Sequence, residues 1–384
     1  MILRSAKTKG YLLLSLMLLP VLFFSRGETP WPSVPGSVSE VAAMHIARAS
    51  QSSTLLPNGK VLIAGGFAGS GGEYNPYRTT ELYDPGSGTF EFAASMSIGR
   101  SGHTATLLKN GKVLMVGGWT GRYDIRRSAE LYDPAMNTFA PTGNLVVERA
   151  GSTATLLADG RVLIAGGEDR GENALASAEI YDPAAGRFTL TGSMAEPRGA
   201  HTATALRDGR VLIVGGGSGH YPSQNVYRSA EIYDPATGKF TLTGEMSVGR
   251  HKHAAILLRR GRVLIVGGSD NLDWHGEYAS AEIYDPVAGT FTPTGVMKTT
   301  RFKLPSAVAL LPNGKVLVAG GGPFAELYDE TTGTFAMVPG SLGAARFFAS
   351  ATLLPGGKAL IAGGYAESGG SLPATSVAWL YQPR

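Results

Sequence analysis

Val113–Gly118 reads VLMVGG, and it is one of seven copies of a short apolar strand that ends in a glycine pair. The glycine pairs of the seven copies are Gly65–Gly66, Gly117–Gly118, Gly166–Gly167, Gly215–Gly216, Gly267–Gly268, Gly320–Gly321 and Gly363–Gly364. Their first glycines are spaced 52, 49, 49, 52, 53 and 43 residues apart. A period near 50 residues is typical of the blades of a β-propeller. The repeat therefore predicts an all-β chain built from seven similar sheets.

Each repeat carries signals for four strands around this phrase. In the second repeat, the run Thr104–Leu108 leads to Asn110-Gly111 and then to VLMVGG. Asn-Gly between two β-prone runs predicts a hairpin whose two central residues both have positive φ. The same slot holds Asn58-Gly59, Asp159-Gly160, Asp208-Gly209, Arg260-Gly261, Asn313-Gly314 and Gly356-Gly357, of which Arg260-Gly261 suits such a turn least. A third strand at Ser128–Asp133 and a fourth near Phe139 complete a predicted four-stranded blade.

Aromatic residues recur at two places of the repeat. The tyrosines of the third strand are Tyr83, Tyr132, Tyr181, Tyr233, Tyr284, Tyr328 and Tyr381. The phenylalanines of the fourth strand are Phe90, Phe139, Phe188, Phe240, Phe291 and Phe335. Because aromatic side chains bury a large apolar area, we expect them to form the core between neighbouring blades. The glycine pairs are expected to allow a close backbone approach or an unusual φ at the strand end.

The two ends of the repeat region predict how the ring closes. The seventh repeat reaches Arg384 just after its third strand, while the spacing Val38…Met44…Arg48 copies the fourth-strand pattern Phe188…Met194…Arg198. We expect the N-terminal segment to supply the outer strand of the last blade, because closure removes exposed sheet edges. The predicted propeller domain spans 28–384, with blades at approximately 48–99, 100–148, 149–197, 198–249, 250–300, 301–345 and 346–384 plus 33–47.

Residues 1–27 have the pattern of a signal peptide. Three basic residues (Arg4, Lys7 and Lys9) precede the apolar stretch 11–24, and small residues at 25 and 27 suit cleavage before Glu28. The stretch is shorter than the roughly 20 residues of a membrane-spanning helix. We therefore expect an exported protein, extracellular or periplasmic, which needs no membrane after removal of the signal. An uncleaved membrane anchor is the alternative.

Charge and cysteine content exclude several functional classes. Residues 1–27 hold four of the 34 Lys and Arg and none of the 30 Asp and Glu, so the predicted mature chain has 30 of each. A net charge of zero gives no support to a nucleic-acid partner. The chain contains no cysteine, which excludes disulfides, thiol nucleophiles and thiolate metal ligands. We expect a monomer without a cofactor.

The glycine pair after an apolar strand, the tyrosine about 15 residues later and the following aromatic residue resemble the kelch repeat. The resemblance covers residues 48–384 and departs in one respect, because the late aromatic, usually Trp in that family, is Phe here. It implies a seven-bladed kelch-type propeller, a fold that mostly serves as a binding scaffold. The fold is also similar to that of the copper enzyme galactose oxidase. The cofactor of that enzyme needs a Tyr–Cys crosslink, which a chain without cysteine cannot form.

The loops between second and third strands (2–3 loops) vary between repeats, whereas the strands recur. They emerge on the same face as the loops that link one blade to the next (4–1 loops), because antiparallel strands alternate in direction. Variable loops on a rigid scaffold are common recognition surfaces, and Trp and Tyr combine apolar area with a hydrogen-bonding end. The predicted ligand-binding residues are Trp119, Tyr123, Tyr221, Tyr227, Trp274, His275 and Tyr278. The sixth repeat has almost no 2–3 loop, which predicts an open rim there.

An arginine opens each first strand, at Arg48, Arg100, Arg149, Arg198, Arg250, Arg301 and Arg346. Six repeats also place a glutamate before the tyrosine, at Glu81, Glu130, Glu179, Glu231, Glu282 and Glu326, whereas the seventh has Trp379. We expect repeated Arg–Glu ion pairs rather than an anion-binding ring. Three residues after three of these arginines stand His103, His201 and His253, which could converge on a metal at the axis, although their spacing is no metal motif.

The sequence contains no nucleophile elbow, HExxH helix or P-loop. We therefore expect a non-catalytic binding module that recognises a protein or a glycan through the face of the 2–3 and 4–1 loops. The alternative is a carbohydrate-active enzyme, metal-assisted through His103, His201 and His253. A third hypothesis is a structural or adhesive envelope protein without a soluble ligand.

Overall fold

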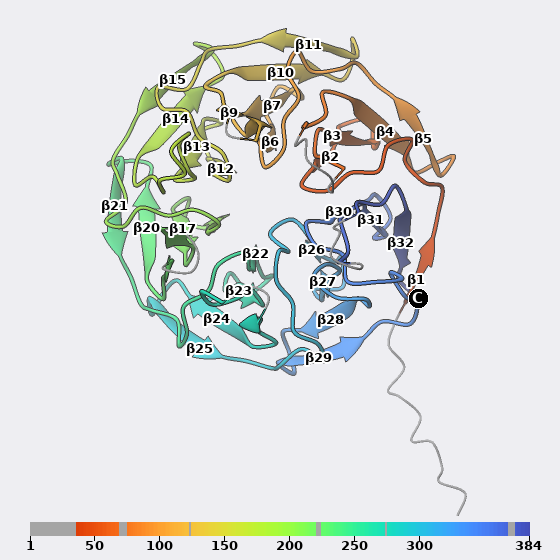
Figure 1. The fold of residues 1–384 in the computed structure, drawn as a ribbon. Helices are drawn as coiled ribbons and strands as arrows, with labels where there is room; N and C mark the ends of the chain where they lie inside the picture. Colours follow the sequence, from red (N-terminus) through yellow and green to blue (C-terminus); the bar gives the residue numbers. More distant parts are fainter. Residues whose placement is uncertain (1–35, 69–74, 123, 220–223, 273–274, 368–372) are drawn as a thin grey trace, which may run out of the picture. The chain divides into compact units, whose positions relative to one another are not determined.

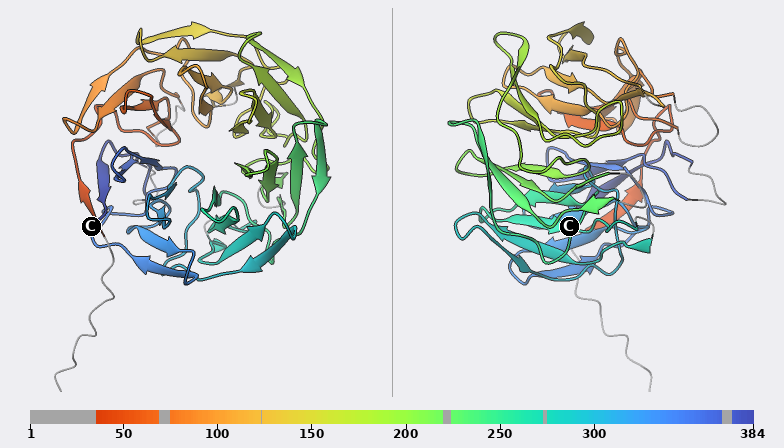
Figure 2. Two further views of the ribbon diagram at one scale, coloured as in Figure 1. Left: turned by 180° about the vertical axis from the view of Figure 1, so that it is seen from behind. Right: turned by 60° about the vertical axis from the view of Figure 1, so that its left-hand side comes forward.

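The computed structural model describes residues 36–68, 75–122, 124–219, 224–272, 275–367 and 373–384. The propeller is the compact unit formed by residues 34–384. Its seven four-stranded antiparallel sheets are arranged as blades of a ring (Figure 1). The first strand of each blade is innermost and the fourth is outermost, which Figure 2 shows from the opposite side. The predicted fold class, a seven-bladed β-propeller, is confirmed.

The blades are numbered in chain order. Blade 1 contains β2 (Ser52–Leu55), β3 (Val61–Ala64), β4 (Thr80–Asp84) and β5 (Thr89–Phe92); blade 2 contains β6 (Thr104–Leu107), β7 (Val113–Val116), β10 (Ala129–Asp133) and β11 (Thr138–Pro141). Blade 3 contains β12 (Thr153–Leu156), β13 (Val162–Ala165), β14 (Ala178–Asp182) and β15 (Arg187–Leu190); blade 4 contains β16 (Thr202–Ala205), β17 (Val211–Val214), β20 (Ala230–Asp234) and β21 (Lys239–Leu242).

Blade 5 contains β22 (Ala254–Leu257), β23 (Val263–Val266), β24 (Ala281–Asp285) and β25 (Thr290–Pro293); blade 6 contains β26 (Val308–Leu310), β27 (Val316–Val318), β28 (Glu326–Asp329) and β29 (Thr334–Met337). Blade 7 contains β30 (Ser350–Leu353), β31 (Ala359–Ala362), β32 (Ala378–Gln382) and β1 (Ser37–Glu40). Two small ribbons, β8 (Trp119–Gly121) with β9 (Asp124–Ile125) and β18 (Gly217–Ser218) with β19 (Asn225–Val226), extend 2–3 loops. Within the described residues, no helix has the length and apolar character that a membrane crossing needs.

Closure of the ring follows the predicted pattern. Strand β1 pairs with β32, and Val38 lies opposite Tyr381, as Phe188 lies opposite Tyr181 in blade 3. The outer strand of blade 7 therefore comes from the N-terminal side of the chain, while its three inner strands come from the C-terminal side. Val38 is buried in the core between blades 6 and 7.

The second strands form the centre of each interface between blades. All four residues of β7 (VLMV) and of β13 (VLIA) are buried, because both faces of these strands pack against a neighbouring blade. The recurring aromatics fill the same interfaces: Tyr181 and Phe188 of blade 3 pack with Leu114 and Val116 of blade 2. The ring centres of Tyr181 and Phe188 are 4.7 Å apart. The prediction that these aromatics form the core between blades is confirmed.

The glycine pairs link neighbouring blades through the backbone. Gly66 donates its N–H to the carbonyl of Arg100 at 2.8 Å, and Gly364 of blade 7 donates to Arg48 of blade 1 at 2.9 Å. The same bond occurs at all seven interfaces. Gly65 has a φ of +66°, and a Cβ there would collide with the Arg100 carbonyl. Positive φ and close approach therefore both require glycine, as expected.

The hairpins between first and second strands exist as predicted. The predicted pair of positive φ angles occurs at Gly356-Gly357 but is wrong for the other six hairpins. At Asn58-Gly59, only Gly59 has a positive φ, of +83°. Gly59 N–H bonds the carbonyl of Leu56 at 3.0 Å, and Leu56 N–H bonds that of Lys60 at 2.8 Å. This is a three-residue loop in which a turn is followed by one left-handed glycine. The residue before the glycine needs no positive φ, so the backbone of the turn accommodates Arg260. Asn58 adds a hydrogen bond that arginine cannot make, because its Oδ1 accepts the N–H of Lys60 at 3.1 Å.

Candidate functional site

A cavity of about 1450 Å³ is lined by residues of all seven blades around the axis. Its wall comes from the first strands and from the segments that lead into them. Nine of the lining residues are serine or threonine: Ser50, Ser52, Ser53, Thr104, Ser152, Thr153, Thr202, Ser306 and Ser350. A hydroxyl both donates and accepts hydrogen bonds. The cavity wall therefore carries a dense, uncharged set of donors and acceptors. Five of these hydroxyls also bond other side chains between blades: Ser52, Ser53, Thr153, Thr202 and Ser350.

The mouth of the cavity is formed where 2–3 and 4–1 loops meet. The residue directly after a glycine pair forms an antiparallel β-bridge with the residue directly after an arginine. Trp119 pairs with Ser101 in this way, and Glu168 pairs with Ala150. This pairing places the two kinds of loop on one face, as predicted. Blade 6 forms no such bridge within the described part of the chain, and only Gly322 and Pro323 separate its glycine pair from Phe324.

A ring of left-handed residues surrounds the axis at this level. It consists of the residues two positions after each arginine, here called the collar: Ser50, Gly102, Gly151, Ala200, Lys252, Lys303 and Phe348. All seven have φ between +53° and +59°. Backbone hydrogen bonds join most neighbours in the collar, such as Gly102 N–H to Ser50 O at 3.2 Å and Lys252 N–H to Ala200 O at 2.9 Å. Except for Lys303, the collar residues line the cavity.

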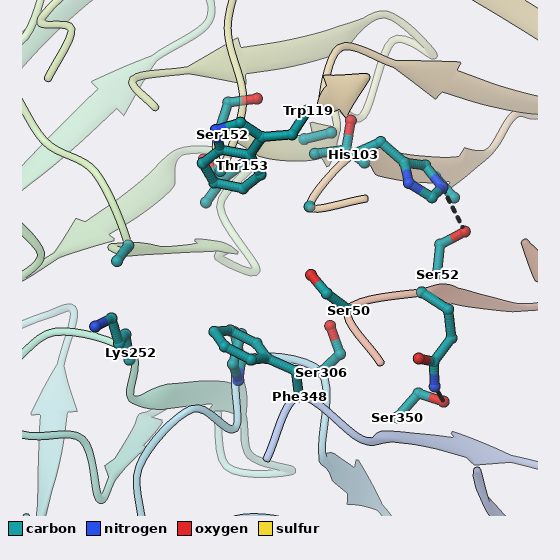
Figure 3. Close-up of a pocket in the computed structure, with 18 of the residues that line it drawn as sticks. Ser50, Ser52, His103, Trp119, Ser152, Thr153, Lys252, Ser306, Phe348 and Ser350 are labelled. Carbon is teal, nitrogen blue, oxygen red and sulfur yellow. Dashed lines mark hydrogen bonds between the residues drawn. The ribbon is translucent and has the colours of Figure 1, made fainter. Parts of the chain in front are cut away.

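The indole of Trp119 lies on the two glycines of the collar. A Cβ at Gly102 would collide with Cζ3 of that ring, and a Cβ at Gly151 would lie 3.2 Å from its Cη2. Trp119 is partly exposed and lines the cavity. Figure 3 shows its ring on one side of the open space, with Phe348 and Lys252 on other sides. The mouth thus combines aromatic faces with polar groups.

Charged residues are few among those that line the cavity. They are Arg122, Glu168 and Lys252. Phe67 and Tyr77 add two more aromatic rings from the 2–3 loop of blade 1. A neutral wall with aromatic rings at the rim suits a ligand that has both polar edges and apolar faces.

The three histidines proposed as metal ligands make separate contacts between blades. Nε2 of His103 lies 2.9 Å from Ser52 Oγ, that of His201 lies 3.1 Å from Thr153 Oγ1, and that of His253 lies 2.9 Å from Thr202 Oγ1. Each hydroxyl belongs to the preceding blade, so the histidines bridge successive first strands. Within the described residues, no group of three or more His, Cys, Asp or Glu is placed to hold a metal ion.

The Ser52–His103 contact resembles a nucleophile and its base, but burial changes the chemistry of the imidazole. Burial, with the positive charge of Arg100, lowers the pKa of His103 to about 3. Burial and the charge of Arg198 lower the pKa of His201 to about 3 as well. A base this weak takes a proton poorly near neutral pH. Nδ1 of His103 has no hydrogen-bond partner among the described residues that would orient the ring. The geometry therefore fits a structural contact.

The predicted ligand-binding residues lie in different surroundings. Trp119 lines the cavity. The ring of Tyr227 covers the guanidinium of Arg198 at 5.1 Å, and that of Tyr278 covers Arg250 at 5.2 Å. His275 is exposed and is not among the residues that line the cavity. Three further predictions, Tyr123, Tyr221 and Trp274, lie outside the described residues.

The arginines that precede the first strands form the expected ion pairs with glutamates of the third strands. Arg149 and Glu179 are fully buried and 2.9 Å apart. Burial lowers the pKa of Arg149, and the hydrogen bond and charge of Glu179 oppose that shift. Glu179 also accepts the N–H of Val146, from the 4–1 loop, at 2.7 Å. Equivalent pairs occur in blades 1 to 6 and tie each 4–1 loop to the third strand.

Several residues of the cavity mouth were missing from the sequence-based prediction. They are Ser50, Phe67, Gln224, Lys252 and Phe348. The signal for four of them is present in the repeat, because they stand two residues after an arginine or directly after a glycine pair. The sequence alone, however, does not show which of these positions lies at the axis and which lies on the rim.

The comparisons agree with this architecture. The family description "KLHDC2/KLHL20/DRC7 Kelch-repeats domain" matches residues 102–321, and "Kelch motif" matches residues 48–97. No curated protein matches the sequence. Among solved structures, a fungal alcohol oxidase of the AA5 family in complex with copper is similar with a TM-score of 0.69 and 17% identity, over 91% of this chain and 76% of that chain. YjhT is similar with a TM-score of 0.55 and 14% identity, over 64% of this chain and 84% of that chain.

At these identities the two structures show the fold alone. A Tyr–Cys cofactor of the galactose oxidase type does not fit this protein, because the chain has no cysteine. The match to residues 102–321 covers more than half of the chain, and the protein belongs to the kelch-repeat family of β-propellers.

Proposed function

We propose that the protein is a binding module that takes a glycan into its axial cavity. The observation that carries the proposal is the combination of nine serine and threonine residues on the cavity wall with Trp119 at its mouth. Sugar rings present hydroxyls at their edges and C–H groups on their faces. Hydroxyls of the wall can both donate to and accept from the edges, while an indole stacks on the faces.

The size of the cavity supports a ligand larger than one sugar. Its volume of about 1450 Å³ exceeds the roughly 300–1,000 Å³ of pockets for drug-sized molecules. Two positive side chains and one carboxylate among the described lining residues leave most of the wall neutral. A neutral oligosaccharide meets these conditions better than a highly charged peptide, which would lose hydration without gaining an opposite charge.

The test is a binding screen of the purified protein against a glycan array and a peptide library, followed by titration of Trp119→Ala. We expect binding to glycans and a loss of at least tenfold in affinity for Trp119→Ala, with little change in Tm, because Trp119 is partly exposed. The control is Phe92→Ala, which removes an aromatic side chain that is 56% exposed on the outer strand β5, away from the axis. Absence of glycan binding, or equal affinity of Trp119→Ala and wild type, would overturn the proposal.

We also propose that the protein acts after export, as the predicted signal peptide at residues 1–27 implies. N-terminal sequencing of the protein from extracytoplasmic fractions tests this. A chain that begins at Glu28 is the expected result, and an intact Met1 in a membrane fraction would favour the anchored alternative.

A further inference from the structure

We infer that the collar encodes the selectivity of the cavity, with Lys252, Ser50 and Phe348 contacting the part of the ligand that stacks on Trp119. The inference rests on the proposed function. It names the residues that decide which sugar is accepted, whereas the proposed function concerns only whether a glycan binds.

The backbone of the collar points to this role. Five of its seven residues are not glycine, although all seven are left-handed. A left-handed φ costs free energy for any residue that has a side chain, whereas glycine adopts it without that cost. The hydrogen bonds of the collar use only backbone atoms, such as Ser50 N–H to Phe348 O at 3.2 Å and Phe348 N–H to Lys303 O at 2.7 Å. Glycine could make the same bonds, so the backbone does not explain why side chains are kept. Packing accounts for part of it, because Nζ of Lys303 lies 4.7 Å from the ring centre of Phe302 and the ring of Phe348 packs near that of Tyr365.

The two positions that do hold glycine have a visible reason. Gly102 and Gly151 lie under the Trp119 ring, which fills the space of their absent side chains. At the other cavity-lining positions the side chain itself stands at the mouth: Ser50, Ala200, Lys252 and Phe348. The side chains and the indole thus divide the circumference of the mouth between them. Strained positions that are kept with side chains at a cavity mouth are typical of ligand contacts.

The chemistry of these groups defines the contacted unit. Trp119 and Phe348 provide two ring faces at the opening, and Figure 3 shows Lys252 and Ser50 on opposite sides of the same open space. The ammonium group of Lys252 donates hydrogen bonds, and the Ser50 hydroxyl donates and accepts them. A pyranose held against an aromatic face, with hydroxyls at opposite ends of the ring directed to Lys252 and Ser50, uses all four groups. We infer that the terminal sugar of the glycan occupies this place.

The experiment compares the affinity, glycan-array profile and Tm of Lys252→Ala, Lys252→Gly and Ser50→Gly with those of wild type. The control is Asn137→Gly, which relaxes a left-handed φ of +48° between the outer strands β10 and β11, outside the set of residues that line the cavity. We expect both Lys252 variants and Ser50→Gly to lose at least tenfold in affinity and to change the ranking of terminal sugars. Lys252→Gly should have a higher Tm than Lys252→Ala, because glycine accepts the left-handed φ. Asn137→Gly should keep the wild-type affinity and ranking.

The outcomes separate the two claims. Wild-type binding with unchanged ranking in the Lys252 and Ser50 variants would overturn the role of the collar while leaving glycan binding in place. An equal loss of affinity for every sugar, accompanied by a fall in Tm, would show a structural role and would also overturn it. Failure of the wild type to bind any glycan would overturn the proposed function and the inference together.

Discussion

Arg346 lies against Trp379, with its guanidinium carbon 5.2 Å from the centre of the indole ring. In the six other blades the equivalent arginine meets a buried glutamate at 2.8 to 3.2 Å. Trp379 stands in the place of that glutamate on β32, the strand that receives β1. The blade that closes the ring is therefore held by a cation–π contact where the others have an ion pair.

This difference predicts unequal effects of removing the arginines. Arg149→Ala leaves Glu179 buried without its charged partner, and loss of one member of a buried pair costs about 3–5 kcal/mol of stability. Arg346→Ala removes a cation–π contact, which contributes about 0.5–2 kcal/mol. Chemical denaturation should therefore show a larger loss for Arg149→Ala. Equal losses would contradict the assignment of the two contacts. Lys60→Ala, which removes a partly exposed ion pair with Asp84 at the surface, should change stability little.

The buried histidines predict a loss of stability in acid. The pKa of His103 is about 3 in the folded protein and about 6.5 in the unfolded chain. Between these pH values only the unfolded chain binds the proton. The stability linked to neutral, buried His103 is therefore fully present above pH 6.5 and declines as the pH falls. The free energy of unfolding then decreases by about 1.4 kcal/mol per pH unit for each such histidine.

His103→Gln tests this directly, because Gln51 fills the same slot in blade 1 and donates to the carbonyl of Ala362 at 2.8 Å. Denaturation at pH 6, 5 and 4 should give the variant a shallower decline than the wild type, by about 1.4 kcal/mol per pH unit. Parallel curves for the two proteins would show that His103 is not kept neutral by burial.

Substitution by alanine should cost different amounts of stability at two left-handed glycines, one in a glycine pair and one in an outer hairpin. Gly65→Ala combines a φ of +66° with a collision against the Arg100 carbonyl at the interface with blade 2. Gly88→Ala has a similar φ of +72°, but no atom lies within 4 Å of its Cβ. Gly88→Ala should cost about 1–2 kcal/mol from backbone strain alone. Gly65→Ala should cost clearly more, and a comparison of their Tm values checks the difference. Similar values would mean that the close approach of the blades is not rigid.

Ring closure predicts a sharp boundary for N-terminal truncation. A chain without residues 1–33 keeps β1 and should melt like the full propeller. A chain without residues 1–40 lacks β1, so β32 becomes an exposed edge that can pair with other chains. Its Tm should fall, and size-exclusion chromatography should show association. A monomeric second truncation with an unchanged Tm would contradict closure by β1.

The repeat allowed the blades, their number and the closing strand to be predicted, because each follows from spacing along the chain. The period of the glycine pairs marks the blades, and the match of Val38 to Phe188 identifies the closing strand. The ion pairs were predictable for the same reason, since a buried arginine in every repeat needs a partner in every repeat. Local pattern was less informative at Asn58-Gly59, because Asn-Gly fits turns with one or two left-handed residues.

The site was predicted less completely, because it depends on contacts between blades. Nothing in the types of Lys252 or Phe348 indicates a left-handed φ, which is imposed by hydrogen bonds from neighbouring blades. Tyr227 and Trp119 both looked like exposed loop aromatics, but Tyr227 covers Arg198 whereas Trp119 lies at the cavity mouth. The spacing along the sequence predicts where a residue lies within its blade. Its neighbours across the axis depend on how the seven blades close into a ring.

The most direct measurement is a crystal structure of the protein with the oligosaccharide that binds best in the glycan screen. The account predicts a terminal sugar in the axial cavity, with its ring against Trp119 and its hydroxyls within hydrogen-bonding distance of Ser50 and Lys252. A ligand bound on the outer strands or on the opposite face, with the axial cavity empty, would contradict it.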